Sequence, residues 1–501
     1  MNVHFIDWII AGLFLIFLTM GGWACRFFVR DVTGFVVAGR HMRKFLGLST
    51  HTAESLGIIS FAGLMEAGFK DGFSYVGVSV IHILIVPIIY GCTGFVVDRY
   101  RKARVVTTAE YAERRYSKGV RITTAAVLSF AGIVNLAIFP IMASRFMTHF
   151  LGVSDTTILG MPVVPALMGI LLGIALLFAC CGGLVSVLLT DFIQSVLIAV
   201  MLFIVTGLMI ADTGASQIFD TVRNEIGERG FSPLKSETFG PLFLTWMVLQ
   251  QIVGFPSFAP TMQRIAATDS TKTARQFTML SWLFGQGRGL MMMTWGVAAL
   301  AVMGATAPEG MDEALYPKVV GAMYLGEHLL PPVIFGIVLA ALLAAFISTV
   351  DSYMLTNATL VVNDVICASR KKPISARTQL WLLKIVLTTI TVFLFIFGII
   401  YQPRESILEY LILTGTMMQG AGIILIGGLY WKRGSTVGAY VTVIACCLIP
   451  IADLVLRRLY EEAYPLKPAH AGLIGIIGSS LLYVTFSLLF PGKRREAGDE
   501  S

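Results

Sequence analysis

The stretch Ser49-Thr-His-Thr-Ala-Glu-Ser-Leu-Gly57 interrupts one apolar span of this chain, and Gly254-Phe-Pro-Ser-Phe-Ala-Pro260 interrupts another. Glycine and proline free backbone groups from the helical hydrogen-bond ladder, and inside a bilayer those groups need a ligand, water or a protein partner. The two spans lie five spans apart, so each can open a five-helix repeat. An odd number of helices inverts the second copy, a pattern that indicates a midplane binding site in a secondary transporter.

Each break also has a plainer interpretation, a kinked helix that binds nothing. Two breaks at corresponding positions, one of which carries an acidic residue, favour the binding site. A carboxylate inside the membrane is costly and is usually functional.

Composition supports a membrane protein. The chain has 501 residues, of which 56% are hydrophobic and 13% are charged, and its mean hydropathy is +0.80. This excludes an ordinary soluble protein, and the long apolar runs exclude a β-barrel, whose strands alternate and are short. The net charge of +7 arises from basic residues in short loops, so it predicts orientation in the bilayer and no nucleic-acid partner.

We expect an all-α polytopic membrane protein with about thirteen transmembrane helices. Counting places 25 of the 37 lysines and arginines on one side, Arg264 among them, which predicts an outer N-terminus and a cytoplasmic C-terminus. The predicted spans are approximately 6–27, 45–68, 73–97, 119–150, 160–180, 183–211, 239–263, 276–304, 331–367, 378–401, 406–431, 435–456 and 470–491.

The breaks divide the chain into five parts. A peripheral helix with an inner loop (1–44) precedes the first repeat (45–211). An outer loop (212–238) separates it from the second repeat (239–431). Two peripheral helices and a short cytoplasmic tail (432–501) follow. The first and sixth core helices are the broken ones.

A row of oxygens lies inside the apolar stretch Val333–Ile366. Ala345, Ser348, Thr349 and Ser352 fall at i, i+3, i+4 and i+7, which places them on one face of a helix. Neutral oxygen ligands suit a hard, weakly held cation better than a transition metal. Asp351 falls off this face, so we expect it to pair within the helix bundle.

Four patches resemble the sodium:solute symporter family, nearest to its bacterial proline- and pantothenate-type members. The likeness runs from about residue 35 to 430 and implies a LeuT-like fold that couples sodium entry to solute uptake. The patches are Gly39-Arg-His-Met-Arg-Lys-Phe-Leu-Gly-Leu-Ser49, Thr190-Asp-Phe-Ile-Gln194, Gln263-Arg-Ile-Ala-Ala-Thr-Asp269 and Ala341-Leu-Leu-Ala-Ala-Phe-Ile-Ser-Thr-Val-Asp-Ser352.

The resemblance implies a sodium site between the first broken helix and the eighth core helix. Its ligands would be the carbonyls of Thr52 and Ser55, the carbonyl of Ala345, and the hydroxyls of Ser348 and Thr349. A shift of one residue in the first helix stays open, because the sequence there departs from the small residues common in the family.

Asp191 and Ser352 are candidates for a second ion site or for the ion's exit path, again by resemblance. The alternative for Asp191 is a carboxylate that caps a neighbouring helix or meets the inner headgroups. For the hydroxyls of Ser348 and Thr349 the alternative is a hydrogen bond back to their own helix.

On the solute side, Glu54 lies in the unwound stretch and could attract an amine or donate a hydrogen bond. It could equally be salt-bridged within the bundle, with His51 as its partner rather than a solute ligand. Arg145 could clamp a carboxylate, or its side chain could extend to the interface. Further candidates flank the second break or face the same region: Trp246, Gln250, Phe255, Ser257 and Gln419.

These residues predict a sodium-coupled symporter that imports an amino acid, a carboxylate or a related metabolite. We expect it in a plasma membrane, specifically the bacterial inner membrane, with sodium, the solute and lipid as its partners. The alternatives are proton coupling through Asp191 or Glu54 and, from another class, a transporter-like sensor. The sequence lacks the nucleophile, metalloprotease and phosphate-loop motifs of enzymes, and we expect no cofactor and no transition metal.

Overall fold

The computed structural model describes residues 3–25, 38–154, 156–158, 160–236, 238–401, 406–460 and 464–492. The side chains of 23–25, 181–183 and 185 are not described. Several basic residues used for the orientation lie outside these ranges, namely Arg26, Arg30, Arg404, Lys493, Arg494 and Arg495, as does most of the C-terminal tail.

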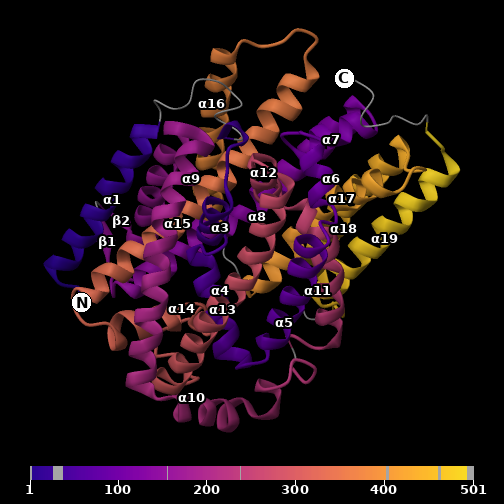
Figure 1. Cartoon of the computed structure of the whole chain (residues 1–501). Helices are drawn as coiled ribbons and strands as arrows, with labels where there is room; N and C mark the ends of the chain where they lie inside the picture. The colour runs from indigo at the N-terminus through magenta and orange to yellow at the C-terminus, as the bar shows by residue number, and fades with distance from the viewer. Residues whose placement is uncertain are drawn as a thin grey trace.

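The described chain is almost entirely helical (Figure 1). Its first half contains α1 (Phe5–Cys25), η1 (Ala38–Arg40), α3 (Lys44–Glu54), α4 (Ile58–Asp71), α5 (Tyr75–Ile85), η2 (Val86–Cys92), α6 (Val97–Lys102), α7 (Thr108–Arg115), α8 (Lys118–Phe150), α9 (Val163–Thr213), α10 (Ala215–Thr221), η3 (Val222–Ile226) and η4 (Gly227–Gly230). Its second half contains α11 (Pro241–Gly254), η5 (Phe255–Ser257), α12 (Ala259–Ala267), α13 (Thr271–Met303), α14 (Tyr316–Met323), η6 (Tyr324–Leu329), α15 (Ile334–Thr359), η7 (Leu360–Cys367), α16 (Ala376–Ile400), α17 (Ile407–Tyr430), α18 (Thr436–Tyr460) and α19 (Pro468–Leu489). One antiparallel pair, β1 (Thr157–Ile158) and β2 (Met161–Pro162), makes up the sheet structure.

Both predicted breaks are present. The first separates α3 from α4, because Gly57 is extended (φ −74°, ψ 167°) and ends the helical hydrogen bonding. The second bends α11–η5 against α12 by 52°. Pro256 and Pro260 have no N–H to donate, and Phe258 between them is extended, so the helix cannot continue straight through.

Ten helical segments of the described chain are long and apolar enough to cross a membrane, or eleven if the bent pair α11–α12 is counted as one span. α3–α4 and α13 lie where two further spans are predicted, but they are shorter or more polar than these. α15–η7 is the most buried of the ten. Figure 1 shows α1 at one edge of the bundle and α18 and α19 at the opposite edge.

Two of the predicted spans, 160–180 and 183–211, are joined in the single 51-residue helix α9. A straight helix of that length would extend about 76 Å. However, Thr213 at its end lies 3.2 Å from the Tyr324 hydroxyl, and the neighbouring Gly326 packs directly on the carbonyl of Phe150, shortly before α9 begins. α9 is therefore not straight, in line with the two spans predicted.

Glycine permits the closest helix packing beside the first break. A Cβ at Gly68 would lie 2.0 Å from the Met293 carbonyl oxygen, and one at Gly296 would lie 2.0 Å from that of Met65. α4 and α13 therefore touch backbone to backbone, which fixes the second half of the broken helix against a long, continuous one.

Candidate functional site: an ion site beside a solute cavity

The end of α3 faces α15 through one hydrogen bond. The Thr349 hydroxyl donates to the Glu54 carbonyl at 2.9 Å, and Gly57 lies against the same threonine. A helix leaves its last four carbonyls without intrahelical partners, so this carbonyl is free to accept. The break and the hydroxyl face are thus brought together, as predicted.

The two predicted carbonyl ligands of α3 have other partners here. The Thr52 carbonyl accepts from Arg288 Nη1 at 3.2 Å, and the Ser55 carbonyl accepts from the Ser60 hydroxyl at 3.2 Å. The Glu54 carbonyl, between them in sequence, is the one that meets α15. This placement fits the register shift of one residue that the sequence left open.

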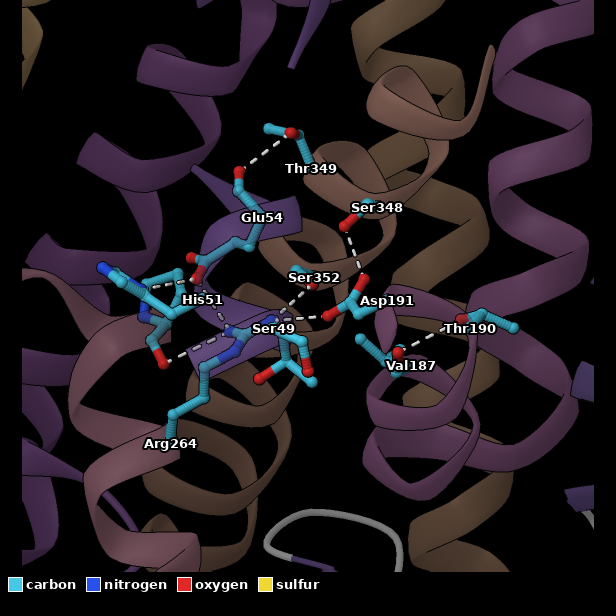
Figure 2. A network of polar contacts seen from close by, with 12 residues as sticks. Ser49, His51, Glu54, Val187, Thr190, Asp191, Arg264, Ser348, Thr349 and Ser352 are labelled. Atoms are coloured by element: carbon cyan, nitrogen blue, oxygen red, sulfur yellow. Dashed lines mark hydrogen bonds and ion pairs between the residues drawn. The ribbon is translucent and has the colours of Figure 1, made fainter. Parts of the chain in front are cut away.

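On α15, Ala345, Ser348, Thr349 and Ser352 are all buried. The Ser348 hydroxyl donates to Asp191 Oδ1 at 2.5 Å, which joins α15 to α9 (Figure 2). The predicted exit-path residue is thereby in direct contact with a predicted sodium ligand, and neither side chain reaches water.

Arg264 is a correction to the sequence analysis. It was counted among the basic residues of an inner loop, but it lies on α12 with 1% of its surface exposed. Its Nη1 is 3.1 Å from Glu54 Oε2, and its Nη2 is 3.0 Å from Asp191 Oδ2. The Ser352 hydroxyl accepts from Nη2 at 3.1 Å. The guanidinium therefore connects four helices (Figure 2).

Glu54 is paired within the bundle, as its structural interpretation predicted, although only His51 was foreseen as a partner. Besides Arg264, His51 Nδ1 lies 3.3 Å from Glu54 Oε2. The second carboxylate oxygen, Oε1, is buried and has no hydrogen-bond partner among the described residues. One oxygen of this carboxylate is thus held in the bundle, and the other is unpaired among the described residues.

A cavity of about 440 Å³ lies beside this network, between the two broken helices and α13. Five predicted solute residues line it: His51, Glu54, Gln250, Phe255 and Ser257. Several other polar and aromatic residues of its wall were not assigned from the sequence, among them His82, Asn135, Phe258, Ser281, Trp282, Gln286 and Tyr353. Those from α13 follow a helical spacing (281, 282, 285, 286, 289), which could have indicated a lining face.

Three predicted solute residues do not line this cavity. Trp246 is buried with its indole against Gly472 of α19 and against Phe243. Gln419 is buried, and its backbone carbonyl accepts from the Ser257 hydroxyl at 3.2 Å. Arg145 lies in the last two turns of α8 and is absent from the residues that line the cavity. Helical spacing alone did not distinguish the cavity wall from the layer behind it.

The cavity wall is rich in neutral polar groups. Ser281 Oγ and Trp282 Nε1 are buried without a partner among the described residues, and His82 Nδ1 lies 3.2 Å from Gln286 Oε1. The lining residues that the structure describes include no lysine and no arginine. A bound solute therefore meets donors, acceptors and aromatic rings, with Glu54 as the charged group.

Asp351 is a second correction. We expected it to pair within the bundle, yet both its carboxylate oxygens are buried and have no hydrogen-bond partner among the described residues. The residue lies three positions after Ser348 on α15, one helical turn from the contact with Asp191.

On the side predicted to be cytoplasmic, side-chain hydrogen bonds join the helices beneath the cavity. Asp364 of η7 accepts from the Thr107 hydroxyl at 2.8 Å and from Arg121 Nε at 2.7 Å. The Thr356 hydroxyl donates to Gln263 Oε1 at 2.7 Å. Toward the predicted outer side the lining continues through Ala67, Tyr75, Ile407 and Leu408, at the ends of α4, α5 and α17.

Comparison with known proteins identifies the family. The sequence model of the sodium:solute symporter family matches residues 35–446, which is most of the chain. The chain belongs to this family. The symporter is therefore a multi-pass transport protein that couples sodium to the movement of a solute.

Its relatives are distant in sequence, but the matches extend over most of this chain and most of each relative. The symporter is 24% identical to a sodium/pantothenate symporter of Haemophilus influenzae over 84% of this chain and 82% of that protein. It is 23% identical to the high-affinity proline transporter PutP of Bacillus subtilis over 87% and 90%. A Na⁺-coupled sialic acid symporter in an outward-open state superimposes with a TM-score of 0.82 at 18% identity, over 98% and 99% of the two chains. This shared architecture is the LeuT-like fold.

Proposed function

We propose that the symporter binds sodium between the end of α3 and α15, and that sodium binding there organises the solute cavity. The proposal rests mainly on the contact between the Thr349 hydroxyl and the Glu54 carbonyl. The proposed ligands are the hydroxyls of Ser348 and Thr349, the carbonyl of Ala345, and a freed carbonyl within Thr52–Ser55. Neutral oxygens of this kind hold a monovalent ion while allowing it to exchange.

The solute is proposed to occupy the cavity of about 440 Å³ beside this site. Glu54 Oε1 would accept from an amine or hydroxyl of the solute, and Gln250 and Ser257 would orient it. Phe255 would stack on an apolar or cationic part. The set omits Trp246, Gln419 and Arg145, which do not line the cavity.

Because one glutamate is the charged group of this wall, an amine-bearing or uncharged solute is favoured over a monocarboxylate. A carboxylate at this position would face Glu54 without a free lysine or arginine among the described lining residues. Of the solutes considered from sequence, those recognised through an amino group therefore fit best.

Import would proceed by alternating access. The contacts of Asp364 and Thr356 on the inner side would open as the outer entrance closes. We propose thirteen membrane crossings in a bacterial inner membrane, with the N-terminus outside and two inverted repeats at 45–211 and 239–431. Asp191 and Ser352 would lie on the route by which sodium leaves.

Uptake into proteoliposomes under an inward sodium gradient tests the proposal, with labelled amino acids, polyamines, sugars and monocarboxylates as a panel. Sodium-driven uptake of an amine-bearing solute is expected for the wild type. Replacing both hydroxyls, Ser348→Ala with Thr349→Ala, should abolish the sodium dependence. Unchanged sodium dependence in that double variant would contradict the site.

Proton coupling is retained as a second candidate because of Asp351. An ionised carboxylate buried without a partner is costly, so this group is suited to holding a proton. Uptake driven by a pH gradient in sodium-free buffer, and lost in Asp351→Asn, would support this candidate. Uptake that needs sodium at every pH would exclude it.

A further inference from the structure

The second break contributes two aromatic rings to the wall of the solute cavity. The Phe255 ring lies 6.4 Å from the Trp282 ring of α13, measured between centroids. The Phe258 ring lies 5.4 Å from that of Tyr353 on α15. Phe255 is helical and Phe258 is extended, so their rings leave the chain in different directions. All four residues line the cavity.

Each of these ring pairs is part of a larger group. His51 and His82 lie 6.2 Å and 5.5 Å from the indole and complete a Trp282 group. Phe139 lies 5.5 Å from Tyr353 and completes a Tyr353 group. Within the described chain no ring contact joins one group to the other. The cavity is therefore bordered by two separate aromatic surfaces.

These surfaces are not fully covered by other side chains. Trp282, Phe258 and Tyr353 are half-buried, and each borders the cavity. Aromatic faces attract other flat π systems and bound cations. A flat ring can lie against both surfaces, whereas a linear aliphatic chain offers them little area. The shape of the wall thus favours a solute that contains an aromatic ring.

Unpaired polar groups of the wall define what that ring must carry. Trp282 Nε1 can only donate, and Glu54 Oε1 is a carboxylate oxygen that accepts. Both atoms are buried without a partner among the described residues. The two residues are neighbours through His51, which contacts the indole and the other Glu54 oxygen. A solute that satisfies both atoms needs one acceptor and one donor.

The rest of the wall disfavours a polyhydroxylated solute such as a sugar. Leu56, Ile59, Leu64, Leu411 and Met418 also line the cavity. Each hydroxyl that leaves water needs a hydrogen-bond partner, and burying one without a partner is costly. A heteroaromatic ring instead carries its polar atoms on its edge and presents apolar faces. That distribution matches a wall of rings and aliphatic side chains with a few polar atoms.

We propose that the solute is a planar nitrogen heteroaromatic compound with both an N–H donor and a ring acceptor, and that Trp282 determines this specificity. The ring stacks against the Trp282 and Tyr353 groups, and the indole N–H donates to its acceptor. This rests on the proposed function, because it places the solute in the same cavity. It adds a substrate class and a specificity-determining residue, within the amine-bearing or uncharged solutes already favoured.

A panel of probes tests the substrate class on the wild type. Adenine, cytosine and nicotinamide represent heteroaromatic solutes, and proline and glucose represent solutes without an aromatic ring. Labelled uptake into proteoliposomes under an inward sodium gradient should be highest for a heteroaromatic probe. Thermal stabilisation of the protein in nanodiscs with sodium gives the affinity of each probe and should follow the same order.

Benzimidazole and indole isolate the hydrogen bond from the indole of Trp282. Both probes are flat fused rings with one N–H, but only benzimidazole has a ring nitrogen that accepts. Loss of a hydrogen bond to a buried donor should make indole bind at least about tenfold more weakly to the wild type. Trp282→Phe keeps a ring and removes the N–H, so the two affinities should agree within about twofold.

Two further variants separate this hydrogen bond from stacking and from folding. Tyr353→Leu removes a ring of the other group, so it should weaken both probes by about fivefold and keep the preference for benzimidazole. Trp246→Phe is the matched control. Its indole N–H is also buried without a partner among the described residues, but Trp246 does not line the cavity. This variant should behave as the wild type.

The outcomes distinguish the inference from the function beneath it. Proline or glucose transported in preference to every heteroaromatic probe would overturn the substrate class and leave sodium coupling intact. An unchanged preference for benzimidazole in a folded Trp282→Phe variant would overturn the role of Trp282. If that variant does not fold, the wild-type preference and Tyr353→Leu decide. Absence of sodium-driven uptake for every solute tested would overturn the proposed function itself.

Discussion

The two broken helices satisfy their freed backbone groups in different ways. At the first break, carbonyls near the end of α3 accept from side chains of other helices, namely Arg288 of α13 and Thr349 of α15. At the second break, the carbonyls of Val253 and Gly254 accept from groups four residues further along the same segment. The carbonyls of the first break therefore join it to other helices, whereas the Val253 and Gly254 carbonyls of the second are satisfied within their own segment. The second break contacts its neighbours through the Ser257 hydroxyl, which meets Gln419 of α17, and through the Ile252 carbonyl, which accepts from Tyr90 of η2.

Glu54→Gln should have the largest effect, because it removes the charge that the first break contributes. Removing one partner of a buried ion pair costs about 3–5 kcal/mol, so we expect uptake in proteoliposomes to fall by about 100-fold. Glu228→Gln is the control, since its partner Lys235 and the glutamate itself are well exposed, and uptake should change less than about twofold. Unaltered affinity for every transported solute would remove Glu54 from the solute site.

Gly57→Ala should come next, through packing at the joint. The new Cβ would lie 2.7 Å from Thr349 Oγ1, so α15 must move away from the break. Overpacking of this kind costs about 1–3 kcal/mol, and we expect the sodium concentration for half-maximal uptake to rise at least about tenfold. Gly12→Ala has nothing within 4 Å of its added carbon and should behave as the wild type. Equal behaviour of the two variants would contradict a tight joint.

Thr349→Ala should weaken sodium activation somewhat less. Loss of the hydroxyl leaves the Glu54 carbonyl without its donor, which costs about 1–2 kcal/mol, or roughly a tenfold rise in the sodium requirement. Thr349→Ser retains the hydroxyl and should stay close to the wild type. Thr359→Ala on the same helix is the control, because that hydroxyl donates to the Leu355 carbonyl of its own helix. A larger effect at Thr359 would show that helix stability, not the joint, is being measured.

Ser257→Ala should have the smallest effect, and it should lower the stability of the protein more than it changes sodium activation. The Ser257 hydroxyl donates to the Val253 carbonyl at 2.7 Å and accepts from the Gly422 N–H at 2.8 Å. We expect about 1 kcal/mol of lost stability, measured as a lower melting temperature in nanodiscs, with sodium activation changed less than about twofold. A tenfold change in sodium activation would mean that the two breaks do not differ as proposed.

Much of the architecture followed from local patterns. Hydropathy predicted the helical segments, and glycine or proline at 57, 254, 256 and 260 predicted where two of them break. The spacing of Ser348, Thr349 and Ser352 predicted one buried face of α15. These are properties of short stretches, so neighbouring residues suffice to find them.

The partners of the charged residues could not be found in this way. Arg264 and Asp191 are 73 residues apart, and nothing near either of them specifies the other. The arginine resembles a loop residue in sequence, because it lies four positions before a polar stretch. Similarly, the sequence did not distinguish the lining residues of α13 from those that only pack, nor Trp246 from the cavity wall.

The sequence by itself determined a helical membrane protein, two interrupted helices and a hydroxyl face, because hydrophobicity, backbone chemistry and helical period are local. Only the tertiary structure decided that the Glu54 carbonyl meets Thr349 and that one buried guanidinium serves Glu54 and Asp191. A charge in a low-dielectric interior is stable only with its partners in place, and those partners come from distant parts of the chain.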